Sequence, residues 1–223
     1  MEKNKFLNKL EHGSYIRTIN YHNTPYFNRD EFEKQLKYFN KYFSSVNEND
    51  LAKFFRKKKW HKEKPGLIIA MYNGYRNNYD IMYPLLEKYG FTGWFFVPSA
   101  FINKTVNQQK QFADQHTLKL IKDEYQDGRY AINWRELREI ANNHVVGSHT
   151  KTHEEIIKTS TKEEMKREII ISKKEIEKEI KQKVNSFCWL GGYRFNYNPK
   201  ATHFIKKAGY KYMFGNGIIE KIS

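Results

Sequence analysis

Short apolar runs alternate along the chain with stretches in which apolar residues recur at helical spacing. The runs are continuously apolar, which is typical of strands buried on both faces of a parallel sheet. They predict strands over residues 66–71, 93–98, 145–147, 185–190 and 210–214. The periodic stretches predict helices over residues 29–43, 51–55, 78–89, 104–125, 134–142, 161–183 and 199–208.

Polar residues before these stretches indicate where the helices begin. Asn28, the pair Asn49-Asp50 and Asn133 each precede a periodic stretch and are predicted N-caps, because their side chains accept a hydrogen bond from the first helical turn. Thr161 opens a capping-box pattern at the start of the longest predicted helix.

The alternation of strand and helix predicts an α/β fold whose parallel strands are joined by right-handed crossovers and closed, or nearly closed, into a barrel. Since no repeat or linker interrupts residues 1–223, we expect a single domain, with lead-in helices over 1–63 and a barrel core over 64–218. The carboxyl ends of the strands carry the chemistry in such barrels. Asn73, His149 and Gly191 follow three different predicted strands and are expected to converge there.

His149 and His153 directly follow one of the predicted strands. Two residues four apart on a helical turn share a face, so both imidazoles can reach one ion. Zinc and similar divalent ions bind neutral imidazole nitrogens at about 2.0–2.1 Å. With eight histidines in the chain, this spacing can also arise by chance. We interpret the pair as a candidate metal site, with zinc as the expected ion.

The balance of charges is strongly basic, with 40 Lys and Arg against 25 Asp and Glu and a formal net charge of +15. Such a charge raises the question of an anionic partner. Lysine far outnumbers arginine, whereas bidentate recognition of phosphates and bases relies on arginine. Nucleic acid is therefore not the expected partner, and an anionic glycan or membrane surface suits the charge better.

The sequence also limits disulfides, membrane spans and compartment. The single cysteine, Cys188, excludes an internal disulfide. No run approaches the ~18 apolar residues of a membrane span, and the first residues lack the apolar core of a signal peptide. We therefore expect a cytoplasmic protein without a membrane span.

Several segments together resemble the polysaccharide deacetylase family, also described as the NodB homology domain and carbohydrate esterase family 4. The resemblance extends over residues 18–218 and rests on the order and spacing of the motifs. Residues 148–153, SHTKTH, are similar to the family's metal-binding motif. The other similar segments are residues 21–22, 64–91, 132–137 and 187–192.

The resemblance implies a distorted (β/α) barrel of the NodB-like type and metal-dependent hydrolysis of the N-acetyl amide bond, a C–N bond, in a carbohydrate. It implies that His149 and His153 bind the metal. In the family, two adjacent aspartates precede the glycine of the first motif, the first acting as general base and the second as the remaining metal ligand. Here those positions hold Tyr72 and Asn73.

The two replacements limit how far the family's activity can be carried over. With an ordinary pKa of about 10, Tyr72 is a poor proton acceptor at neutral pH. Asn73 offers a neutral carbonyl oxygen, so a site of His149, His153 and Asn73 is expected to hold its metal more weakly. We expect weak or no hydrolysis of the usual family substrates.

The alternative is a pseudoenzyme, a non-catalytic barrel that binds a glycan or a protein partner. In the enzymatic interpretation, the ligand is an N-acetylated carbohydrate or sugar precursor. Asp80, Glu154 and Glu155 could replace the missing base, although each is also explained as an ordinary helix-start or solvent-facing charge. The family's later histidine segment has no counterpart here. Of the spare histidines, His22 could reach the barrel mouth, whereas His203 is interpreted as a helix-surface residue.

Weaker candidates surround these residues. Backbone N–H groups of Gly191 or Gly192 could donate to a developing oxyanion, because glycine allows close approach, but a plain turn explains them equally well. Cys188 has no basic partner, so we expect no nucleophilic role. Aromatic side chains could stack on sugar rings, although such residues more often belong to a core. They are Tyr72, Tyr75, Trp189 and Tyr193.

Overall fold

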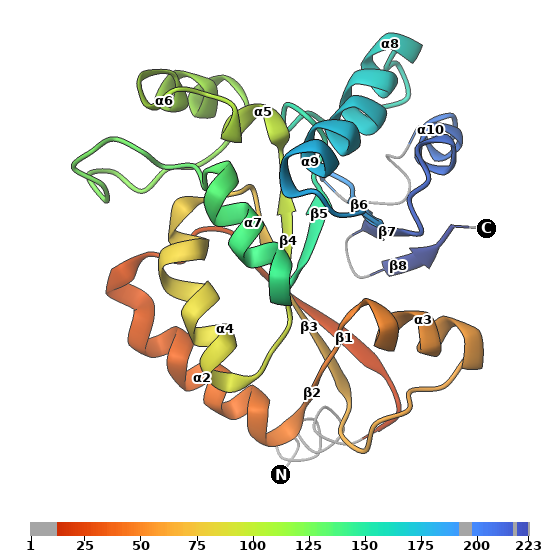
Figure 1. Ribbon diagram of the computed structural model, residues 1–223. Helices are drawn as coiled ribbons and strands as arrows, with labels where there is room; N and C mark the ends of the chain where they lie inside the picture. The colour runs from red at the N-terminus through yellow and green to blue at the C-terminus, as the bar shows by residue number, and fades with distance from the viewer. Residues whose placement is uncertain (1–12, 192–197, 216–217, 223) are drawn as a thin grey trace.

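One curled sheet forms the centre of the computed structural model, which describes residues 13–191, 198–215 and 218–222 (Figure 1). Its strands follow the order β1-β3-β4-β5-β6-β7-β8, and β2 pairs with the first residues of β3. The described pairs are parallel, except that β8 runs antiparallel to β7. The strands are β1 (Ile16–Tyr21), β2 (Ser44–Ser45), β3 (Gly66–Tyr72), β4 (Gly93–Val97), β5 (Val145–Ser148), β6 (Ser186–Cys188), β7 (Tyr212–Gly215) and β8 (Ile218–Lys221).

Helices occupy most of the connections, as parallel pairing requires. They are α2 (Arg29–Tyr42), α3 (Glu48–Lys57), α4 (Tyr83–Tyr89), α5 (Ser99–Ile102), α6 (Val106–Gln115), α7 (Trp134–Asn143), α8 (Lys162–Met165), α9 (Ser172–Ile180) and α10 (Ala201–Ala208). Short helical turns of other types are η1 (Tyr26–Asn28), η2 (Asn78–Met82) and η3 (Lys166–Ile171). Within the described ranges, no helix is both long and apolar enough to span a bilayer.

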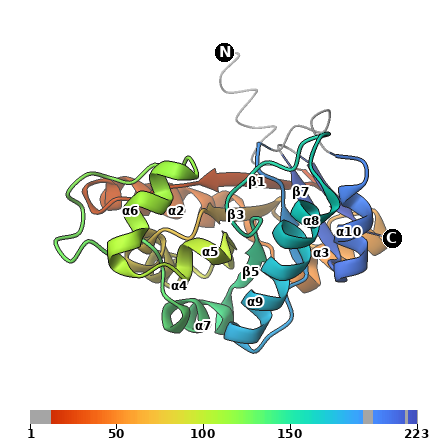
Figure 2. The ribbon, with the colours of Figure 1, turned by 90° about the horizontal axis from the view of Figure 1, so that it is seen from above.

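Two apolar cores lie on opposite faces of the sheet, because side chains alternate along each strand. Ile69 and Met71 of β3 belong to the core under the outer helices, where α2 lies beside α4 and α7 beside α9 (Figures 1 and 2). Ile68 and Ala70 point the other way, into a second core inside the curl that α3 helps to close. Tyr72 belongs to this inner core, so its side chain lies inside the barrel.

The predicted (β/α) barrel is confirmed as a curled, largely parallel sheet with helices on its outer face. Every predicted strand is present, but β1 and β2 come from the first 63 residues, where only helices were expected. The antiparallel strand β8 was not predicted either. Among the described residues, no pairing joins β1 to β8, which stand at opposite ends of the strand order. The wall of the barrel is open between them.

Of the predicted N-caps, Asn133 and Thr161 are confirmed with complete capping boxes. Asn28 takes the N-cap position of α2, but its side chain makes no capping hydrogen bond. The predicted cap Asn49-Asp50 is wrong, because α3 begins at Glu48, three residues before the predicted start, and Asn47 caps it. Asn47 Oδ1 accepts from the Asp50 N–H at 2.9 Å, and Asp50 Oδ2 accepts from the Asn47 N–H at 3.2 Å.

Two predicted helices are shorter than the sequence indicated. The helix expected over 104–125 is present as α6, and the chain after it turns through left-handed conformations at Thr117 (φ 56°) and Asp123 (φ 56°). Such backbone angles interrupt a right-handed helix. The longest predicted helix ends at Ile180 instead of residue 183, because the next residue, Lys181, takes a left-handed conformation (φ 59°).

His144 is a buried imidazole between α7 and β5. Its Nδ1 accepts from the Gly93 N–H at 2.9 Å, and its Nε2 lies 3.0 Å from Glu87 Oε1. Burial lowers the pKa of His144 from 6.5 to about 4, and Glu87 offsets only part of this effect. The unfolded chain therefore binds this proton more readily than the folded chain. The stability that neutral, buried His144 contributes is fully present above pH 6.5. As the pH falls from 6.5 to about 4, we expect the free energy of unfolding to decrease by about 3 kcal/mol.

Urea unfolding of native protein and of His144→Gln, measured from pH 7 down to about pH 4, checks this expectation. The substitution removes the imidazole, so the variant should lose less stability over that interval than the native chain. His203→Gln is the matched control, because His203 is exposed on α10 and should leave the pH dependence unchanged. Equal pH dependence in the native chain and in His144→Gln would contradict the assignment.

Candidate functional site

Polar side chains meet inside the barrel at the carboxyl ends of β1, β3, β5 and β6. There they line a pocket of about 240 Å³. The lining residues are Asn20, His22, Tyr72, His149, Cys188, Trp189, Leu190, Gly191 and Gly215. Of the three residues expected to converge, His149 and Gly191 border this pocket, whereas Asn73 is not among its lining residues and its neighbour Tyr72 is.

The segment that carries both histidines is a loop, and the helical turn expected there is wrong. Thr150 (φ 62°) and His153 (φ 61°) take left-handed backbone conformations that a helix does not contain. The loop is instead held by the buried carboxylate of Glu168, which accepts the backbone N–H groups of Lys151 at 2.9 Å and Thr152 at 2.8 Å. The imidazoles still meet, since the ring centroids of His149 and His153 are 5.4 Å apart.

His149 presents one ring nitrogen to the pocket. Its Nδ1 lies 3.1 Å from the Cys188 carbonyl oxygen, which can only accept, so Nδ1 carries the proton. The lone pair is then on Nε2. Burial, aided by the neighbouring His153, lowers the pKa of His149 to about 3, so the ring is neutral at physiological pH. A neutral imidazole fixed in one tautomer by a carbonyl is the form that binds metal ions.

His153 is fixed in the same way by another carbonyl. Its Nδ1 donates to the His116 carbonyl oxygen at 2.7 Å, and burial lowers the pKa of the ring to about 4. Its Nε2, which therefore carries a lone pair, lies 3.0 Å from Asn73 Oδ1. The Asn73 amide has this orientation because its Nδ2 donates to the Tyr75 hydroxyl at 3.3 Å. The lone pair on His153 Nε2 is thus directed at the side-chain amide of Asn73.

This arrangement fits a divalent metal ion. A lone pair on Nε2 of His149, another on Nε2 of His153 and the carbonyl oxygen of Asn73 are the nitrogen and oxygen donors that zinc-type ions take. A cation bound here would take the lone pair of His153 Nε2 and the amide oxygen of Asn73 as two of its ligands. Asn73 reaches its place through a left-handed backbone (φ 74°), a conformation that asparagine tolerates better than most residues.

Tyr72 fills the position beside these residues. Its ring lies 5.2 Å from that of His149 and stacks on Phe96 at 5.5 Å and on His22 at 5.3 Å. Its hydroxyl donates to Asn20 Oδ1 at 3.4 Å. The ring therefore packs where the resemblance places a carboxylate, and His22 reaches the pocket as expected.

Two of the three possible replacement carboxylates have other partners. Asp80 Oδ2 accepts from Arg76 Nε and from the Tyr125 hydroxyl, each at 3.0 Å. Glu154 is exposed and lies 3.2 Å from His116 Nδ1. Both contacts are those of structural surface charges.

Glu155 is exposed and lies against the turn after β6. Glu155 Oε1 lies 2.5 Å from where a Cβ on Gly191 would stand, and the left-handed backbone of Gly191 (φ 72°) favours glycine at this position. Gly191 borders the pocket, and its role as an oxyanion donor stays a prediction. Gly192 and Tyr193 lie outside the described residues. Within those residues, no third His, Cys, Asp or Glu joins His149 and His153 in a metal-binding group.

The remaining candidates are placed as follows. Burial raises the pKa of the Cys188 thiol to about 12, so the group stays protonated, in line with the expectation of no nucleophilic role. Trp189 lines the pocket, whereas Tyr75 is buried and holds Asn73. The important residue that the sequence analysis missed is Glu168. The sequence did contain a signal for it: Glu168 stands three residues after Met165, so a charged residue falls on the otherwise apolar face of the helix predicted over 161–183.

A curled parallel sheet with imidazoles gathered at the carboxyl ends of its strands defines a (β/α) barrel with one site at its mouth. Residues 59–213 match the sequence profile described as polysaccharide deacetylase, which is more than half of the chain. The chain therefore belongs to the polysaccharide deacetylase family. No curated protein sequence matches it.

Solved structures of deacetylases have the same fold. The Streptococcus pyogenes deacetylase PplD in complex with acetate gives a TM-score of 0.70 at 14% identity, over 94% of this chain and 87% of that one. A de-N-acetylase from Aggregatibacter actinomycetemcomitans gives 0.68 at 17% identity, over 95% and 92%. The BpsB deacetylase domain from Bordetella bronchiseptica gives 0.67 at 13% identity, over 89% and 87%. At these identities the likeness establishes the fold.

Proposed function

We propose that this protein binds a divalent metal ion of the zinc type through His149, His153 and Asn73. We propose further that it acts on the N-acetyl amide bond of a carbohydrate, at a low rate. The observation that carries the proposal is the meeting of three potential ligands: His153 Nε2 lies 3.0 Å from Asn73 Oδ1, and the rings of His149 and His153 are 5.4 Å apart. Family membership supplies the substrate class, an N-acetylated carbohydrate.

When bound, an ion of this type polarises the amide carbonyl and makes a water molecule more acidic. The residues of the chain supply the rest. His149 and His153 stay neutral and fixed in one tautomer, and Asn73 is oriented by Tyr75. The Tyr72 hydroxyl donates a hydrogen bond to Asn20 and is a poor base. This is the reason for the low rate that we propose.

A second candidate function is binding without catalysis. It is favoured by the packing of the Tyr72 ring between His22 and Phe96, and by the engagement of Asp80 and Glu154 elsewhere. In that case the pocket and the ion recognise an N-acetylated glycan or a protein partner. Product formation from N-acetylglucosamine oligomers in the presence of zinc distinguishes the two functions.

Zinc binding is the first test, because it needs no substrate. Calorimetric titration of the metal-stripped native protein should show binding at a single site. His149→Ala with His153→Ala should weaken that binding by at least about a hundredfold, since even the loss of a residue behind a ligand costs ten- to a hundredfold.

His203→Ala is the control, since this histidine is exposed on α10 and should leave zinc binding unchanged. An absence of binding to the native protein at near-millimolar zinc would refute the proposed metal site. Equal binding by the native protein and the double variant would show that zinc is held elsewhere.

A further inference from the structure

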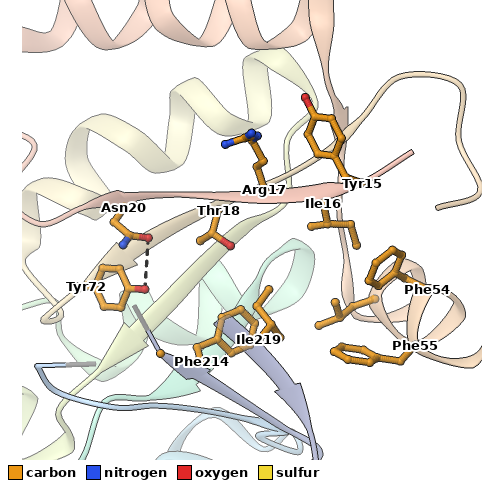
Figure 3. A pocket seen from close by; sticks show the side chains of 12 residues that line it. Tyr15, Ile16, Arg17, Thr18, Asn20, Phe54, Phe55, Tyr72, Phe214 and Ile219 are labelled. Carbon is orange, nitrogen blue, oxygen red and sulfur yellow. Dashed lines mark hydrogen bonds between the residues drawn. The ribbon is translucent and has the colours of Figure 1, made fainter. Parts of the chain in front are cut away.

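The open side of the barrel contains a pocket separate in position from the histidines. It lies between β1 and the end of the sheet formed by β7 and β8, and its volume is about 550 Å³ (Figure 3). Since no pairing joins β1 to β8 in the described part of the chain, this pocket opens through the wall of the barrel. We call it the seam pocket.

One wall of the seam pocket is the inner face of β1. Thr18 is paired with Ile68 and Asn20 with Ala70, and both β3 partners are fully buried. Thr18 and Asn20 are nevertheless exposed. Side chains that face the interior of a sheet are normally covered, so the inner surface is incompletely packed along β1.

The other walls are apolar. Phe54 and Phe55 of α3 and Ile219 of β8 face Ile16 across the pocket (Figure 3). Among the described lining residues the charged one is Arg17, and Figure 3 shows its side chain on the opposite side of β1 from Thr18 and Ile16. The interior of the seam pocket therefore combines a polar wall, formed by Thr18 and Asn20 of β1, with apolar walls from α3 and β8.

The seam pocket adjoins the histidine pocket. Asn20, Tyr72 and Gly215 line both. At the junction the Tyr72 hydroxyl is held by Asn20, and the same ring lies 5.2 Å from that of His149. An acyl chain attached to an amide at the histidines would pass this junction to reach the seam pocket.

We propose that the seam pocket binds the acyl chain of an N-acylated amino sugar whose acyl group is longer than acetyl. This inference rests on the proposed function, because the histidine pocket must hold the amide. The distance along β1 from Ile16 to Asn20 is about 13 Å at ~3.3 Å per residue, which is long enough for an extended chain of several methylenes. Apolar walls stabilise such a chain in proportion to the area that it buries.

The test compares the binding of N-octanoylglucosamine and N-acetylglucosamine to the native protein by calorimetry. The octanoyl compound should bind at least about tenfold more tightly. Thr18→Trp places an indole in the middle of the seam pocket and should bring the ratio of the two affinities close to one. Lys34→Trp adds the same ring on the exposed face of α2 and should keep the native ratio. Equal affinities in the native protein, or an unchanged ratio in Thr18→Trp, would overturn the proposal.

A second measurement needs no variant and therefore does not depend on the folding of Thr18→Trp. N-acylglucosamine with a photoreactive diazirine at the chain end should label residues 51–55 or Ile219 in the native protein. Labelling confined to other segments would refute the proposal. Chain-length preference without turnover of either sugar would contradict only the proposed hydrolysis. Turnover of N-acetylglucosamine oligomers without chain-length preference would contradict only the seam-pocket inference.

Discussion

Tyr72→Asp combined with Asn73→Asp is expected to raise zinc-dependent deacetylation of N-acetylglucosamine oligomers by about 10²- to 10⁴-fold, the usual contribution of a positioned general base. The carboxylate introduced by Tyr72→Asp would supply the proton acceptor that a tyrosine hydroxyl does not. The carboxylate introduced by Asn73→Asp would add a full negative charge beside His153, whose Nε2 lies 3.0 Å from the present amide oxygen, and would hold the ion more firmly. The reaction is followed by the release of acetate.

The control for this prediction is Tyr72→Phe, which removes the hydroxyl but adds no base and should show no gain. The stack of Tyr72 on Phe96 is lost in the double variant, so its thermal unfolding is measured alongside activity. A folded double variant that binds zinc but releases no acetate would show that the deficit extends beyond these two positions.

Glu168→Ala should lower the free energy of unfolding by roughly 3 kcal/mol and weaken zinc binding by about ten- to a hundredfold. The Glu168 side chain is 2% exposed, and its carboxylate accepts the N–H groups of Lys151 and Thr152 and the Thr152 hydroxyl at 2.9 Å. Alanine would leave these donors without their acceptor. The loop that places His149 and His153 would then lose its main support.

Urea unfolding and zinc calorimetry on the same preparation check both parts of this prediction. Glu163→Ala is the matched control, because Glu163 is an exposed glutamate of α8, just before η3, and should change neither quantity. A variant that loses stability but binds zinc as tightly as the native chain would show that Glu168 supports the fold without positioning the histidines.

Continuous apolar runs predicted the central strands well because those strands are buried on both faces. The run over 66–71 is an example, since all of β3 (Gly66–Tyr72) is buried. β1 escaped prediction because Arg17, Thr18 and Asn20 give it no such run. Its place in the sheet depends on pairing with β3, about fifty residues later in the chain, and local periodicity carries no information about such a distant partner.

The candidate site could be predicted in its residues but not in its backbone. The spacing of His149 and His153 indicated a shared ion, and the two rings do lie together. A helical turn was the wrong reason, because left-handed residues at Thr150 and His153 and the buried Glu168 shape the loop. The two imidazoles are fixed by the backbone carbonyl groups of Cys188 and His116. The pattern of side chains along the sequence cannot predict contacts to backbone atoms.

A sheet with two ends also affects how separate molecules behave toward one another. The backbone at the end of a sheet is a template on which a strand from another molecule can pair and begin an aggregate. Arg17 on β1 and Lys221 on β8 are exposed and carry the same sign of charge at the two ends. Together with the net charge of +15, they repel a second copy that approaches edge to edge. The basic character of the chain thus helps to keep it dispersed, and salt, by screening these charges, weakens that protection.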